Sequence, residues 1–178
     1  MRKYFLTIYA LLAFGLFNGC GIYSMSGISI NYDQTKTISI LNMYNDATLG
    51  PVNMPQTLTN SLRDYYQQNT NLVLVDGSAE GDLQIEGGIV SYLTAPLSPQ
   101  SSGSNRVGDT ARQTRLTITV KITYINTQDD TFNFENKRFS FFRDFDSNAN
   151  LTSIENQLVD EIFEQITMDI FNASVANW

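Results

Sequence analysis

Acidic side chains are the residues whose spacing comes closest to a catalytic arrangement. Asp144 and Asp146 lie two residues apart after an aromatic stretch, and a later segment adds Asp160, Glu161 and Glu164. Paired carboxylates can hydrolyse glycosidic bonds. The first pair, however, falls between a predicted strand and a predicted helix, where acids suit turns and helix starts. The other three lie off the apolar stripe of that helix. A carboxylate-dependent hydrolase is therefore the least favoured function of those considered.

The composition excludes most other kinds of catalytic or metal site. The chain has 178 residues, no histidine and one cysteine. Histidine-based acid–base chemistry, histidine-ligated metals, an internal disulfide and a paired-cysteine redox motif are excluded. The formal net charge of −7 also argues against sequence-independent binding to nucleic acid, which needs a basic face. We therefore predict a protein that is not an enzyme, uses no cofactor or metal, and does not bind nucleic acid.

The single cysteine, Cys20, follows a segment that is typical of an export signal. Arg2 and Lys3 precede an apolar run over residues 4–17, which is shorter than the ~20 residues that a transmembrane helix needs. Gly19 and Cys20 then resemble the end of a bacterial lipobox, in which the cysteine is lipidated after cleavage. The alternatives are an ordinary secretory cleavage site and a free thiol, although an exported free thiol would be open to oxidation. We predict lipidation at Cys20.

This interpretation divides the chain into three parts. Residues 1–19 are predicted to be a lipoprotein signal peptide, residues 20–34 a lipidated tether, and residues 35–178 a single folded domain. Removal of the signal peptide takes away two basic residues and no acid, so the net charge would move from −7 to −9. The domain is long enough to bury a core without disulfides. The tether spans at most ~50 Å, which favours a function close to the membrane.

Basic residues are scarce, and several are predicted to gather at one end of a sheet. Arg106, Arg112 and Arg115 lie at the end where the long loop joins the sheet, and a hairpin folded at residues 126–131 would bring Arg143 to the same end. With few acids expected nearby, their planar guanidinium groups could bind phosphate or carboxylate. The alternative is a set of solvated surface arginines. Lys121 falls roughly opposite Glu86, which predicts a cross-strand ion pair. Lys137 and Arg138 are expected midway along the same hairpin.

Apolar periodicity predicts the elements that position these residues. The strands are expected at residues 36–44, 72–75, 82–93, 115–126 and 132–143, and the helices at residues 55–69 and 152–173. Pro55 suits the first position of a helix, and Thr152 with Glu155 forms a capping box. Gly87 and Gly88 suggest a bulge. The alternation of the last strand changes phase midway, and residues 94–114 form a long loop rich in Ser and Gly.

The resulting order is β-α-β-β-β-β-α, which predicts an α+β two-layer sandwich. Two helices would cover one face of a mostly antiparallel sheet of four or five strands, in agreement with the one-sided alternation of the strands. The first crossover would make its two strands parallel. The outer face of the central strand is rich in threonine, and the parity of Phe141, Phe142 and Phe145 requires some of these rings to point away from the helices.

The chain also resembles the LptE family of outer-membrane lipopolysaccharide-assembly lipoproteins. The resemblance covers nearly the whole chain after residue 19 and is carried by order and coverage rather than by one signature. The segments concerned are Cys-Gly-Ile-Tyr-Ser (20–24), Gly-Asp-Leu-Gln-Ile-Glu-Gly (81–87), Arg-Leu-Thr-Ile-Thr-Val-Lys (115–121), Phe-Phe-Arg-Asp-Phe-Asp (141–146) and Val-Ala-Asn-Trp (175–178).

The resemblance implies a non-enzymatic protein that is lipid-anchored at the periplasmic face of the outer membrane. It implies an LptD-like β-barrel as partner, whose lumen the protein plugs, and a role in inserting lipopolysaccharide into the outer leaflet. Basic residues on the sheet and its loops would bind lipopolysaccharide. The nearest candidates are Arg112, Arg115, Lys121, Arg138 and Arg143. The alternatives are a periplasmic lipoprotein that regulates a cell-wall enzyme and, less favoured, the hydrolase.

Overall fold

A computed structural model describes residues 30–76, 81–97 and 113–175. The strands are β1 (Thr37–Ile40), β2 (Tyr44–Asn45), β3 (Val73–Val75), β4 (Leu83–Pro96), β5 (Gln113–Asn126) and β6 (Phe134–Asp146). The helices are α2 (Met54–Asn69), α3 (Leu151–Ser174) and the 3₁₀ turn η1 (Asp130–Phe132). Residues predicted to form the signal peptide, most of the tether and most of the long loop lie outside the described residues.

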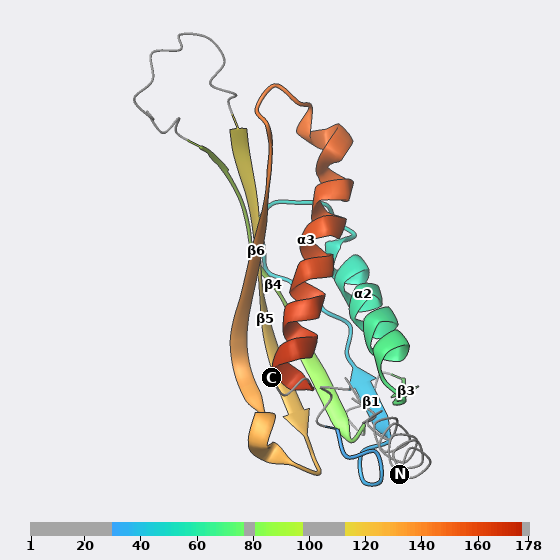
Figure 1. Ribbon diagram of the computed structural model, residues 1–178. Helices are drawn as coiled ribbons and strands as arrows, with labels where there is room; N and C mark the ends of the chain where they lie inside the picture. Colours follow the sequence, from blue (N-terminus) through green and yellow to red (C-terminus); the bar gives the residue numbers. More distant parts are fainter. Residues whose placement is uncertain (1–29, 77–80, 98–112, 176–178) are drawn as a thin grey trace, which may run out of the picture.

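The strands form one mixed sheet in the order β3-β1-β4-β5-β6, with β2 pairing to β4 (Figure 1). The pairs β1–β3, β1–β4 and β2–β4 are short and parallel, whereas the long pairs β4–β5 and β5–β6 are antiparallel. Both helices lie on the same side of the sheet. The predicted two-layer α+β fold, its element order and the parallel crossover from β1 to β3 are confirmed. The two-residue strand β2 was not predicted.

The core lies between the sheet and the two helices, where the sequence periodicity places it. In β5, Leu116, Ile118, Val120, Ile122 and Tyr124 are buried under the helices. The apolar stripe of α3 from Leu158 to Ile170 is buried against them. Burial at roughly 25 cal/mol per Å² of apolar surface makes this interface the main source of stability. The alternate residues of β5 consequently face away from the helices, and they form the outer face of the sheet.

The phase change predicted in the last strand is a bulge. The register of β5 and β6 shifts between Ile122 and Tyr124, and Asn136 at the same place on β6 has a φ of 53°. Asn tolerates this left-handed conformation better than most residues. The backbone N–H of Asn136 donates to Oγ1 of Thr123 at 3.2 Å. The bulge allows Phe134 and Phe139 to face the same side despite their different parity.

The bulge suggested at Gly87 and Gly88 lies two residues further along. The register of β4 against β5 shifts between Ile89 and Ser91. The two glycines are instead required by close contacts, because a Cβ on Gly87 would lie 2.1 Å from the Lys121 carbonyl oxygen. A Cβ on Gly88 would lie 2.5 Å from the Tyr44 carbonyl oxygen.

The predicted capping box of α3 is wrong. Asn150 is the N-cap, and its Oδ1 accepts from the backbone N–H of Thr152 at 3.1 Å. Glu155 does not cap the helix and instead binds the sheet, where its Oε1 accepts from the Tyr92 hydroxyl of β4 at 2.6 Å. This bond joins the helix layer to the sheet, and burial, followed by the bond to Glu155, raises the pKa of Tyr92.

Candidate functional site

The outer face of the sheet carries most of the predicted basic residues. Arg115 on β5 pairs in register with Asp144 on β6. Its Nε and Nη2 donate to the two carboxylate oxygens at 2.7 and 2.9 Å, and its Cζ lies 3.6 Å from the ring centroid of Phe142. The guanidinium is thus held flat between an acid and an aromatic ring, and its hydrogen bonds keep the pKa of the Asp144 carboxyl below its usual range.

Lys121 and Arg138 lie directly opposite each other on the same face. They are register partners on β5 and β6. Among the described residues, neither side chain has an ion pair or a hydrogen bond. Like charges directly opposite each other destabilise a strand pair. An anion bound between these two cations would therefore relieve their mutual repulsion.

The ion pair predicted between Lys121 and Glu86 is wrong. Glu86 is the register partner of Thr123, whereas Lys121 is paired with Gly88. Glu86 and Lys121 are therefore diagonal neighbours on the same face, and both line one hollow. No ion pair joins Glu86 to Lys121 within the described part of the chain.

A hollow of about 210 Å³ borders Lys121 on this face. Tyr44 of β2 crosses over Gly88 here, and only a glycine leaves space for its ring. The position of Tyr44 against Gly88 was not predicted, although the paired glycines were the available signal. The residues that line the hollow are Leu41, Asn42, Tyr44, Glu86, Gly87, Lys121, Thr123 and Asn136.

Arg143 does not belong to the outer-face group. It pairs in register with the buried Leu116, so its side chain leaves the sheet on the helix side. Its Nε donates to Oε2 of Glu161 on α3 at 2.9 Å. The predicted gathering of Arg115 and Arg143 is thus divided between two faces, and each arginine has an acid partner, contrary to the expectation of few acids nearby. Arg106, Arg112 and Cys20 lie outside the described residues.

Exposed apolar groups lie beside the outer-face cations. Leu93 on β4 and Phe142 on β6 are both register partners of Thr117, and their side chains are 57% and 40% exposed. Phe141 and Phe145 instead pack against the core. The parity argument that some of these rings must turn away from the helices is therefore confirmed for Phe142. Together, the cations, the threonines and these apolar groups give an amphipathic surface.

The carboxylates considered for hydrolysis have structural partners. Asp144 is held by both nitrogens of Arg115. Oδ1 of Asp146 accepts from the backbone and side-chain amides of Asn148 at 2.7 and 3.0 Å, which closes the turn before α3. A general acid needs a raised pKa, whereas the pKa of Asp144 is lowered. This pair does not have the properties of a glycosidase site.

The described residues contain no group of three or more acidic or cysteine side chains placed to hold a metal ion. None of the described helices has the length and apolar character that crossing a membrane requires.

Comparison with known proteins agrees with this fold. A family model described as lipopolysaccharide-assembly, LptE, matches residues 35–174. No curated protein matches the sequence significantly. The hypothetical protein CT253 from Chlamydia trachomatis has a TM-score of 0.50 at 9% identity, over 80% of this chain and 99% of that chain. The rare lipoprotein B from Shewanella oneidensis has a TM-score of 0.47 at 14% identity, over 76% of this chain and 92% of that chain. At these identities the likeness to CT253 concerns the fold alone.

Proposed function

The chain belongs to the LptE family of lipopolysaccharide-assembly proteins, and on this premise we propose that it is a non-enzymatic outer-membrane subunit of lipopolysaccharide insertion. Cys20 carries the lipid anchor at the periplasmic face. The folded domain assembles with an LptD-like β-barrel and plugs its lumen. It helps to insert lipopolysaccharide into the outer leaflet, and the outer face of its sheet contacts that ligand.

The unpaired cations Lys121 and Arg138 are the observation that carries the proposed contact with lipopolysaccharide. A chain with a net charge of −7 repels a polyanion at long range. Binding must therefore come from local cations, and this pair has no acid partner in the described residues. A phosphate between the two side chains would convert a repulsive pair into charge-assisted hydrogen bonds.

The remaining outer-face residues support the same ligand class. Thr119 and Ser140 lie within 3.0 Å of each other between the cation pair and the Arg115 end, and their hydroxyls can bond to sugar or phosphate. Leu93 and Phe142 offer apolar surface to acyl chains. The uncharged threonines of β5 on this face are also suited to contact with the inside of a barrel.

One purification experiment tests the proposal. The full chain is purified in mild detergent from the cells that make it, and the copurifying protein and lipopolysaccharide are quantified. We expect a β-barrel to copurify with the wild-type chain and with the double variant Lys121→Gln, Arg138→Gln. We expect the amount of copurified lipopolysaccharide to fall by at least about tenfold in the double variant, because each charge-assisted hydrogen bond contributes roughly 1.5–3 kcal/mol.

Lys137→Gln provides the matched control. Lys137 is adjacent to Arg138 on β6, but its Nζ lies 5.1 and 5.4 Å from the ring centroids of Phe134 and Phe139. It has the same charge and faces the helix side, so its removal should leave the copurified lipopolysaccharide unchanged. An equal loss in the control and the double variant would exclude a site at Lys121 and Arg138. A chain that purifies without a barrel would exclude the proposed partner.

A further inference from the structure

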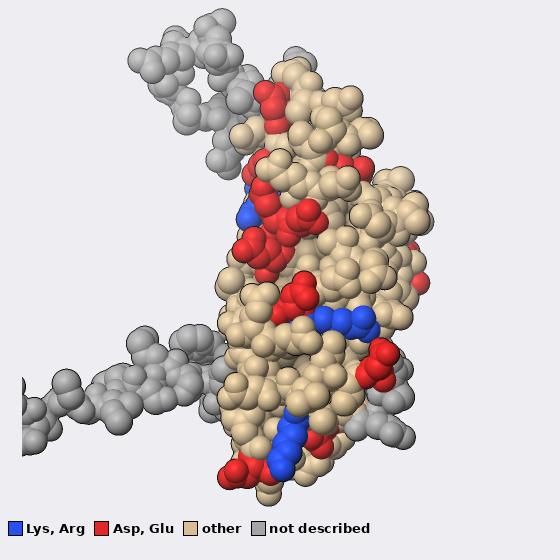
Figure 2. All heavy atoms as spheres, turned by 90° about the vertical axis from the view of Figure 1, so that its right-hand side faces the viewer, with Lys and Arg blue, Asp and Glu red and all other residues tan. Residues whose placement is uncertain are grey.

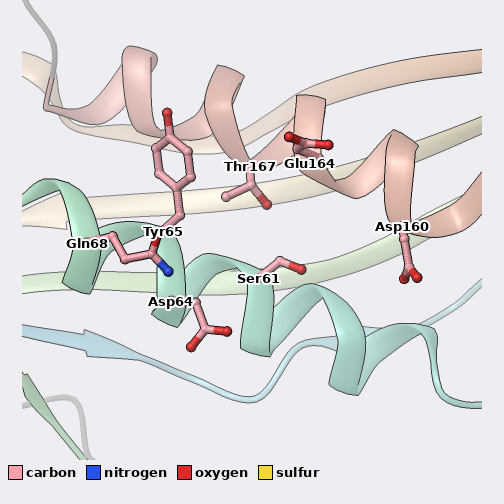
Figure 3. Close-up of a pocket in the computed structure, with 7 residues that line it drawn as sticks. All are labelled: Ser61, Asp64, Tyr65, Gln68, Asp160, Glu164 and Thr167. Carbon is pink, nitrogen blue, oxygen red and sulfur yellow. The ribbon is translucent and has the colours of Figure 1, made fainter. Parts of the chain in front are cut away.

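A groove between the two helices is lined by carboxylates (Figure 3). It has a volume of about 220 Å³ and lies on the side of the molecule away from the sheet. Asp160 extends from α3 toward α2, whereas the carboxylate of Asp64 lies on the side of α2 away from α3. The residues that line it are Ser61, Asp64, Tyr65, Gln68, Asp160, Glu164 and Thr167.

The three acids of this groove have no cation. Within the described residues, Asp64, Asp160 and Glu164 make no ion pair and no side-chain hydrogen bond. Two other acids of the described residues do have a cation partner, since Glu161 accepts from Arg143 and Asp144 accepts from Arg115. Asp160 and Glu164 are also four residues apart on one helix, an arrangement that is unfavourable for like charges.

The wider surface of the helix layer has the same sign. Figure 2 looks onto the helix side of the molecule and shows more Asp and Glu than Lys and Arg on that face. The helix α3 itself contains acids but no lysine or arginine. A positively charged ligand is therefore attracted to this face and repelled by no cation of α3.

Thr167 provides an independent sign that the groove has a ligand. This residue is 1% exposed, and its Oγ1 has no hydrogen-bond partner in the described part of the chain. Its side chain projects from α3 toward α2 and lines the groove (Figure 3). A buried hydroxyl without a partner is costly, and threonine in a helix commonly bonds to a carbonyl of the preceding turn instead. The hydroxyl is placed to accept from a donor that enters the groove.

We propose that the groove binds the ammonium or guanidinium group of a lysine or arginine side chain presented by a partner protein. The cation would lie beside Asp160 and Glu164 of α3, and an N–H of the cation would donate to Thr167 Oγ1. An organic cation with several N–H donors can bond to the two carboxylates of α3 and to the hydroxyl at the same time. The Tyr65 ring at the edge of the groove suits the apolar stem of such a side chain.

This docking site is separate from the proposed contact with lipopolysaccharide. The groove lies on the helix layer, and Lys121 and Arg138 lie on the opposite face of the sheet. The site needs a cation, whereas the outer face of the sheet needs an anion. The failure of one proposal therefore leaves the other intact.

Ligand-observed NMR on the full chain tests the docking site with simple probes. The probes are an acetylated Arg-Gly-Arg peptide amide, its citrulline counterpart and spermidine. We expect the arginine peptide to bind and the uncharged citrulline peptide not to bind. The double variant Asp160→Asn, Glu164→Gln should lower the affinity for the arginine peptide by at least about tenfold, because it removes both charges with little change of shape.

Thr167→Val separates a binding role from a structural one. Removal of an unpaired buried hydroxyl should raise the Tm of the free chain. Loss of the hydrogen-bond acceptor should lower the affinity for the arginine peptide by about threefold or more. Asp169→Asn is the matched control, because it removes the same charge from α3 at a carboxylate that accepts from Gln165 at 2.9 Å. Its affinity for the peptide should equal that of the wild-type chain.

Three results would overturn the proposal. The first is an affinity for the arginine peptide that is unchanged by Asp160→Asn with Glu164→Gln. The second is an affinity for the arginine peptide that is unchanged in Thr167→Val, which would show that the hydroxyl takes no part in binding. The third is tighter binding of spermidine than of the peptide, which would identify the groove as a site for small free amines.

Discussion

A single carboxylate oxygen joins the starts of β1 and β4. Oδ2 of Asp82 accepts from the backbone N–H groups of Lys36 and Thr37 at 2.9 and 3.0 Å, and from Oγ1 of Thr37 at 2.9 Å. The backbone N–H of Asp82 donates back to the same hydroxyl at 2.9 Å. The bond from Lys36 is the largest cause that lowers the pKa of Asp82. The sequence placed this acid only at the start of a predicted strand, because its partners lie 45 and 46 positions away.

We predict that Asp82→Asn lowers the free energy of unfolding by about 1 kcal/mol at pH 7, a value reduced for solvent access. The folded pKa lies below the unfolded value of about 3.9. The contribution of the charge is therefore present above about pH 4 and is lost as the pH falls through the folded pKa. Urea unfolding at pH 7 and pH 2.5 measures the difference in unfolding free energy between the wild-type chain and Asp82→Asn. This difference should be smaller at the lower pH. Asp46→Asn, at an exposed acid, is the control, and an equal loss there would contradict the prediction.

Arg115 and Arg143 show what the sequence could and could not predict at single residues. Their places at one end of the β5–β6 hairpin followed from strand alternation and were predicted. Their division between two faces depends on the register, which the bulge at Asn136 fixes. Their acid partners, Asp144 and Glu161, depend on how α3 lies against β6. Tertiary packing decides both features, so residue types alone do not reveal them.

At the scale of elements, the helices and long strands were predictable because each has one buried face. The alternation in β5 and the stripe in α3 are continuous over many residues. The short strand β2 has two exposed residues and no alternation, so it gave no signal. The glycines of β4 did signal an irregularity, but its kind was visible only when Tyr44 and Lys121 were placed against them.

We predict that Gly87→Ala destabilises the sheet by more than about 3 kcal/mol. Gly87 has a φ of 151°, which residues with a side chain rarely adopt, and the new Cβ would lie 2.1 Å from the Lys121 carbonyl oxygen. Because that oxygen belongs to the backbone of β5, relief would require the two central strands to separate. Urea unfolding of Gly87→Ala measures the loss, with Ser91→Ala on the same strand as control. A loss below 1 kcal/mol would show that the strands yield easily.

At the scale of the whole molecule, each of the two layers presents a local group of unpaired charges. The outer face of the sheet presents the unpaired cations Lys121 and Arg138, while the helix layer presents the unpaired acids of the groove. The hydrophobic core lies between the two surfaces. A protein whose net charge is negative can thus bind an anion on one side and a cation on the other, because each contact depends on local rather than net charge.

We predict that the two layers bind their ligands independently. The lipopolysaccharide affinity of a variant with both pairs of substitutions, Lys121→Gln with Arg138→Gln and Asp160→Asn with Glu164→Gln, should equal that of the sheet variant alone. Groups separated by a packed core and more than about 10 Å have additive effects within ~0.5 kcal/mol. Titration of lipopolysaccharide into the four members of this cycle, at one fixed salt concentration, measures the coupling. A coupling above 1 kcal/mol would show that the helix layer senses the ligand of the sheet, and the two faces would then act as one site.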